Sequence, residues 1–167
     1  MEFQSAHNSS SISTDKLENI MQQMRDIQQG FQKETVSEMA QKLEKLMQNI
    51  LYLSSEEENL GTEVEKTYRN SPRLKDLAAR QQVLQDQLQS ITNQMMQLSK
   101  ETFDITPEIG RGIGKANYGM QEAKEKLTEK NTSQAKESQN LAMQGLNDAA
   151  VGLFNSCLLY TSPSPRD

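Results

Sequence analysis

The sequence predicts an all-α protein: a long antiparallel helical hairpin with additional packed helices, forming a coiled-coil-like bundle. Three observations lead to this prediction. Apolar residues make up only 34% of the chain, below the ~45–50% of an average globular domain. The commonest residues, Gln, Glu, Lys, Leu, Met and Ala, are good helix formers. Apolar side chains recur at spacings of three and four, which gives each helix one narrow stripe to bury.

The pattern predicts a disordered leader and five helices. Residues 1–13 are Ser-rich and aperiodic, and we expect them to be disordered. The helices that follow are expected at 14–32, 34–68, 72–102, 107–129 and 132–155, so that the bundle covers residues 14–155.

Local signals place the boundaries between these helices. The apolar stripe shifts register between Phe31 and Val36, which predicts either two helices or one kinked helix there. Ser71-Pro72 and Thr106-Pro107 each pair a capping residue with a proline suited to the first helical turn. Asn131-Thr132 provides the last turn.

Two long stripes predict the hairpin. Helices of the lengths expected at 34–68 and 72–102 are about 45–50 Å long at ~1.5 Å per residue, and the turn between them is short. One polar residue interrupts each stripe, Glu57 in the first and Gln81 in the second. The apolar members are Val36, Met39, Leu43, Leu46, Ile50, Leu53, Leu60 and Val64, then Leu74, Leu77, Leu84, Leu88, Ile91, Met95 and Leu98.

Residues 156–167 form a tail unlike the rest of the chain. Cys157–Asp167, CLLYTSPSPRD, resembles residue for residue the translation of a transposase adaptor used to prepare sequencing libraries. We interpret the tail as non-native and leave it out of the fold prediction. We expect the natural protein to continue past Asn155 and to begin before Met1. The alternatives are a proline-rich docking peptide and a flexible end.

Glycines near the start of the fourth predicted helix are candidates for close packing. Gly110 and Gly114 lie one turn apart, and Gly119 extends this small-residue surface. A phosphate-binding glycine loop would need a preceding strand, and no strand is predicted. Each glycine costs ~1 kcal/mol of helix propensity, so we expect a close helix contact at Gly110 and Gly114.

Apolar residues of the third predicted helix are the other interaction candidates. They are Leu84, Leu88, Ile91, Met95 and Met96. Methionine-rich stretches at helical spacing are typical of a core, and they also occur in grooves that bind peptides.

The sequence offers no constellation for catalysis. The single histidine, His7, lies in the leader, and the single cysteine lies in the tail. We interpret Glu56–Glu58 as a solvated face, because three adjacent carboxylates on a helix point in different directions and do not converge on a metal ion. The sequence therefore predicts no enzyme, no catalytic or metal-binding residue, no cofactor and no small-molecule substrate.

Charge and hydropathy restrict the partners. The net charge is −5 with acids and bases interspersed, and no basic block marks a nucleic-acid surface. No apolar run approaches the ~20 residues of a membrane-spanning helix. We expect protein partners, either a second copy of the chain or other helices.

Five stretches carry a resemblance to a known family. They are LYLSSEEENL (Leu51–Leu60), DLAARQQ (Asp76–Gln82), LSKETF (Leu98–Phe103), TPEIGRGIGKA (Thr106–Ala116) and AMQGLNDAA (Ala142–Ala150). Together they resemble a helical segment of domain of unknown function 4175, found in large bacterial membrane proteins, over roughly residues 15–155. Ser55-Glu56-Glu57 departs from the Gln-Glu pair expected after YLS.

The resemblance implies a long parent protein in the bacterial cell envelope, with membrane-spanning helices upstream and an extracytoplasmic helical region. It implies no catalytic activity, substrate or cofactor. We therefore expect a structural or scaffolding role through helix–helix interactions. The alternatives are a chaperone-like or adaptor-like coiled coil that binds clients through a Met/Leu face, and a regulatory module attached to an enzyme elsewhere in the parent.

Overall fold

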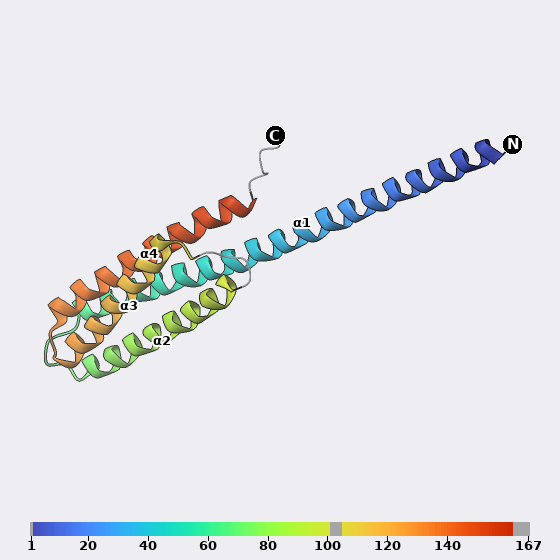
Figure 1. The fold of residues 1–167 in the computed structure, drawn as a ribbon. Helices are drawn as coiled ribbons and strands as arrows, with labels where there is room; N and C mark the ends of the chain where they lie inside the picture. Colours follow the sequence, from blue (N-terminus) through green and yellow to red (C-terminus); the bar gives the residue numbers. More distant parts are fainter. Residues whose placement is uncertain (1, 101–104, 162–167) are drawn as a thin grey trace. The chain divides into compact units, whose positions relative to one another are not determined.

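The computed structural model describes residues 2–100 and 105–161 (Figure 1). They form four α-helices: α1 (Glu2–Glu65), α2 (Arg73–Ser99), α3 (Pro107–Thr128) and α4 (Thr132–Thr161). No strand occurs among these residues, which confirms the predicted all-α class. The chain divides into two compact units, Met1–Met39 and Ala40–Asp167, and α1 runs through both.

The first unit differs from the prediction. The expected disordered leader at 1–13 belongs to α1 from Glu2 onward, and the expected break at 30–35 is absent. The described residues therefore form four helices where we predicted five. No proline or glycine occurs between Glu2 and Gln29 to stop the helix. Gly30 lies in open space, and a stripe that shifts register moves around a helix without breaking it.

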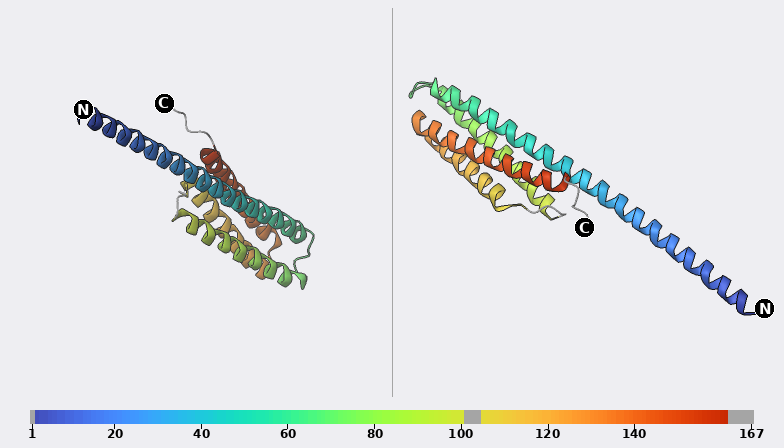
Figure 2. Two further views of the ribbon diagram at one scale, coloured as in Figure 1. Left: turned by 90° about the vertical axis from the view of Figure 1, so that its right-hand side faces the viewer. Right: turned by 90° about the horizontal axis from the view of Figure 1, so that it is seen from above.

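The second unit is an up-down-up-down four-helix bundle made of the C-terminal half of α1 with α2, α3 and α4. Figure 2 shows the four segments side by side in both views. Side-chain contacts give the neighbours: Arg80 to Glu63 between α2 and α1, Gln85 to Asn117 between α2 and α3, and Ser54 to Asn147 between α1 and α4. Short turns between successive helices make this the simplest bundle topology.

The bundle buries the apolar stripes that the sequence predicts. Each helix turns one row of apolar side chains inward and leaves polar residues in water. The largest fully buried side chains are Leu43, Ile50, Leu53, Leu60, Leu77, Leu88, Met95, Ile109, Met120, Leu127 and Leu146. The core therefore runs the length of the bundle as one narrow column.

The turn before α2 differs from the prediction by one residue, because α2 begins at Arg73, with Pro72 as its N-cap, and Ser71 Oγ accepts a hydrogen bond from the Arg73 nitrogen at 3.2 Å. The turn before α3 uses the signal read from the sequence. The Thr106 hydroxyl oxygen accepts a hydrogen bond from the Ile109 backbone nitrogen at 3.4 Å, and Pro107 is the first residue of α3. At the other end of α3, Lys130 adopts φ 59. The Asn131 nitrogen then donates to the Lys126 oxygen at 2.8 Å, which closes the helix with a Schellman turn. α4 continues to Thr161, beyond the expected end at residue 155 and into the predicted tail.

Candidate functional site

Most of the predicted apolar interaction residues lie inside the bundle. Leu84, Leu88, Ile91 and Met95 are buried along α2, and each residue is at most 7% exposed. Met96 is 53% exposed. Four of these five candidates therefore hold the bundle together, and only Met96 is open to a partner.

The close packing predicted at Gly110 and Gly114 is wrong within this chain. A Cβ added at either position would meet nothing within 4 Å. Other glycines make the close approach instead. A Cβ at Gly112 would lie 2.7 Å from the Ala149 nitrogen, and one at Gly119 would lie 2.6 Å from the Ala142 nitrogen. Gly112 and Gly119 share the face of α3 that carries its buried stripe, whereas Gly110 and Gly114 lie off that face.

The contact is reciprocal from α4. A Cβ at Gly145 would overlap the Ala116 backbone, and one at Gly152 would lie 2.6 Å from the Ile109 side chain. The two helices thus meet backbone to backbone. We call this contact the α3–α4 seam and define it by Ile109, Gly112, Ala116 and Gly119 with Ala142, Gly145, Ala149 and Gly152.

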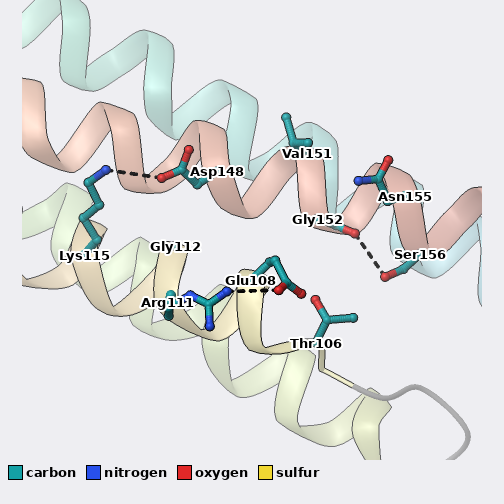
Figure 3. Close-up of a pocket in the computed structure, with 10 residues that line it drawn as sticks. All are labelled: Thr106, Glu108, Arg111, Gly112, Lys115, Asp148, Val151, Gly152, Asn155 and Ser156. Carbon is teal, nitrogen blue, oxygen red and sulfur yellow. Dashed lines mark hydrogen bonds and ion pairs between the residues drawn. The ribbon is translucent and has the colours of Figure 1, made fainter.

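A cavity of about 670 Å³ opens beside one end of the seam. Figure 3 shows ten of the residues that line it. Its charged residues are paired with each other. Arg111 lies 3.0 Å from Glu108, and Lys115 lies 3.3 Å from Asp148. The pKa of Glu108 is lowered by hydrogen bonds to its carboxylate from its own backbone and from Thr106, and by the nearby Arg111. The four charged residues at the cavity are thus engaged in two ion pairs.

A polar layer crosses the apolar core. It consists of Glu57 on α1, Gln81 on α2 and Gln139 on α4, and all three are 0% exposed. Gln81 Nε2 donates to Glu57 Oε1 and Oε2 at 2.8 Å each. Gln139 Nε2 donates to Gln81 Oε1 at 2.9 Å. The prediction of a solvated Glu56–Glu58 face is therefore wrong for Glu57, whereas Glu58 is exposed.

The sequence contains a signal for this layer. Glu57 and Gln81 are the two residues that interrupt the long apolar stripes. Gln139 holds the equivalent place on α4, four residues after buried Ala135 and three before buried Ala142. A polar residue in a core slot predicts a buried hydrogen-bonded partner, and the three polar slots supply one another.

Burial sets the ionisation of Glu57. Removal from water disfavours the charged carboxylate and raises the pKa of Glu57 to about 7, and the hydrogen bond from Gln81 offsets only part of that rise. An amide donor stabilises the carboxylate but does not neutralise its charge. Glu57 therefore titrates near neutral pH, where an ordinary surface glutamate is fully ionised.

One polar atom of the layer lacks a hydrogen-bond partner. The Gln139 Oε1 atom is buried and accepts no hydrogen bond. It faces Gly61 of α1, where an added Cβ would lie 3.2 Å from this oxygen and 2.9 Å from Lys136 Nζ. The absence of a side chain at Gly61 leaves room for both groups at this point of the α1–α4 contact.

Residues 55–157 match the family described as Domain of unknown function (DUF4175). The chain belongs to this family. The DUF4175 match begins at residue 55, later than the resemblance read from about residue 15, and it contains the whole polar layer and the α3–α4 seam. No curated protein and no solved structure matches the chain.

The described part of the chain contains no group of three or more His, Cys, Asp or Glu side chains placed to hold a metal ion. None of its helices combines the length and the apolar character that a membrane span requires. Membership of DUF4175 assigns no substrate, cofactor or partner.

Proposed function

We propose that the bundle is a non-catalytic structural module of a longer, membrane-anchored protein of the bacterial envelope, and that it acts by helix–helix packing. The observation that supports this proposal is that the apolar faces of the four helices are buried against one another. The stripes of α1, α2, α3 and α4 pack against one another along the bundle, and the α3–α4 seam brings two backbones into contact. Such packing makes a stiff rod.

The chemistry of the site supports the same proposal. The charges beside the cavity form exposed ion pairs. The one described glutamate that titrates near neutral pH, Glu57, is enclosed and out of reach of a substrate. The envelope location and the anchor rest on the family resemblance, and in this proposal the anchor belongs to other parts of the parent protein.

Exposed methionines favour the second candidate, a module that binds client proteins. Met21 is 51% exposed, Met24 65% and Met96 53%. Flexible, polarizable methionine side chains adapt to varied apolar partners. In this case the binding surface, and not the stability of the bundle, would determine function.

Neighbouring methionines distinguish the two candidates. The variants Met95→Ala and Met96→Ser are introduced into the parent protein, which is purified together with any partner that stays bound; we call this sample the assembly. Its mass is measured by light scattering at a temperature between the melting temperatures of the two variants. The structural proposal expects Met95→Ala to reduce the assembly and Met96→Ser to leave it intact. The client-binding candidate expects Met96→Ser to reduce the assembly as well, because the folded bundle then lacks an exposed contact residue. An assembly that neither variant changes would contradict both.

A further inference from the structure

We infer that the polar layer is a proton-operated switch, in which Glu57 binds a proton inside the bundle and the amides of Gln81 and Gln139 reverse their hydrogen bonds in response. The inference concerns a property of the bundle itself and holds whichever proposed function is correct. It rests on three features of the layer: a fully buried carboxylate, an amide chain with one direction, and an unpaired oxygen at its end.

With Glu57 ionised, every donor in the chain points toward the carboxylate. Gln139 Nε2 donates to Gln81 Oε1, and Gln81 Nε2 donates to both Glu57 oxygens. The negative charge requires this order, because a carboxylate only accepts hydrogen bonds. The order leaves the Gln139 oxygen unpaired at the far end.

With Glu57 protonated, the same three side chains can hydrogen-bond in the opposite order. The carboxylic acid takes one proton from solvent and donates it in a hydrogen bond to Gln81 Oε1. Gln81 Nε2 then donates to Gln139 Oε1, and the Gln139 nitrogen takes the place of its oxygen at the far end of the layer, over Gly61. Each amide only turns over in place, and its oxygen and nitrogen are nearly equal in size. No repacking of the apolar core is needed.

The cations near this level of the bundle are bonded elsewhere. Arg80, next to Gln81, pairs with Glu63 at 2.6 Å. Lys124 of α3 donates to Gln82 Oε1 at 2.8 Å. On α1 itself, the flanking Glu56 and Glu58 are acids, which would oppose a second negative charge.

The remaining cation, Lys136 of α4, lies 3.9 Å from Glu65 at the end of α1. None of these pairs places a positive charge on Glu57. The pKa of Glu57, about 7, agrees with this arrangement, because both forms are then populated near neutral pH.

The switch has an output at the α1–α4 contact. Gln139 Oε1 and Lys136 Nζ converge over Gly61. In the ionised state the ammonium of Lys136 faces an amide oxygen, which attracts it. In the protonated state it faces an amide N–H₂ group, which repels it. Protonation of one carboxyl thus changes the electrostatic surroundings of Lys136, whose Nζ lies 3.9 Å from the carboxylate of Glu65.

The test is a pH titration of the chain with labelled glutamine side chains, spanning two units on either side of the pKa of Glu57, which is about 7. Infrared spectroscopy detects the C=O stretch of a buried carboxylic acid. NMR couplings across hydrogen bonds report which amide donates to which. We expect one acid band to appear on acidification, together with a change from Gln139-to-Gln81 donation to Gln81-to-Gln139 donation.

The variants Glu57→Gln and Glu58→Gln are matched controls one residue apart. Glu57→Gln, which has no titratable group at position 57, should show one amide order at every pH and no acid band from the core. Glu58→Gln should behave as the wild type. The inference is overturned if no acid band forms, or if the amide order stays fixed while Glu57 titrates. Because the wild-type titration alone decides both points, the outcome does not depend on how well a variant folds.

Discussion

Gln81 holds Glu57 by donating its side-chain nitrogen to both carboxylate oxygens at 2.8 Å, with neither residue exposed to solvent. Buried ionised groups usually have a counter-ion or a metal. Here the partner is a neutral amide, so the burial cost of the charge is only partly offset. The bundle therefore holds an ionisable group whose protonation state affects its stability.

The first prediction is that this carboxyl makes the bundle less stable as pH rises. The folded-state pKa of about 7 is above the ordinary value of 4.5, so the folded state binds the proton more tightly than the unfolded state. The contribution is fully present below 4.5 and is lost as pH rises through about 7. At 1.36 kcal/mol per pKa unit the full change is about 3 kcal/mol.

Urea unfolding at a series of pH values, for the wild type and Glu57→Gln, measures this change. The difference in the free energy of unfolding between the wild type and Glu57→Gln should change between pH 4.5 and about pH 7. The other carboxyl groups are the same in both proteins, so their contributions cancel in this difference. Glu63 is one of these, and its pKa is lowered by the hydrogen bond from Arg80. Parallel stability curves would show that Glu57 carries no linked proton.

The second prediction compares two glycines of α3 that lie two residues apart. A Cβ at Gly112 would lie 2.7 Å from the Ala149 backbone, and one at Gly114 would meet nothing within 4 Å. Gly112→Ala should force α3 and α4 apart and lower the free energy of unfolding by about 1–3 kcal/mol. Gly114→Ala should raise it by about 0.5–1 kcal/mol, because alanine favours the helix more.

Chemical denaturation of the two variants tests the seam directly. Both substitutions add the same methyl group to the same helix, so a difference in helix propensity does not explain opposite signs. Equal effects of the two substitutions would mean that the seam is loose enough to accept a side chain.

The bundle could be predicted because the apolar residues spaced three and four apart identify the buried face of each helix. Leu77, Leu88 and Met95 follow from spacing alone, and all are buried. Spacing does not state which neighbour the face meets. Gly110 and Gly114 are spaced by one turn, but neither lies on the buried face of α3. Gly112 does, because it is in register with buried Ile109 and Ala116.

Which polar side chains pair with one another in the layer was beyond prediction for a similar reason. The stripe showed that Glu57 and Gln81 hold core positions, but their pairing depends on how far α1 and α2 are offset along their axes. That offset is set by the whole interface. Gln139 contributes from α4, more than fifty residues along the chain from Gln81, and only the folded bundle brings the two together.

The third prediction concerns the turn between α3 and α4. Lys130 adopts φ 59, a left-handed conformation that costs a residue with a Cβ about 1–2 kcal/mol. Glycine usually occupies this place in a Schellman turn. Lys130→Gly should therefore raise the free energy of unfolding by about 1 kcal/mol. Lys130→Ala is the control and should stay close to the wild type, since alanine bears the same strain. A thermal melt in which both variants change alike would assign the effect to the lost charge.

The fourth prediction uses Met95 and Met96, which are adjacent, identical in type and opposite in environment. Met95 is 2% exposed and Met96 is 53% exposed. Met95→Ala removes buried thioether and methylene groups from the core and should lower the free energy of unfolding by about 2–5 kcal/mol. Met96→Ala should change it by less than about 0.5 kcal/mol. Urea midpoints of the two single variants measure both values in the same helix turn. Equal losses of unfolding free energy in the two variants would mean that Met96 makes a contact outside the bundle, such as one with a second copy of the chain. In that case the urea midpoint would rise with protein concentration.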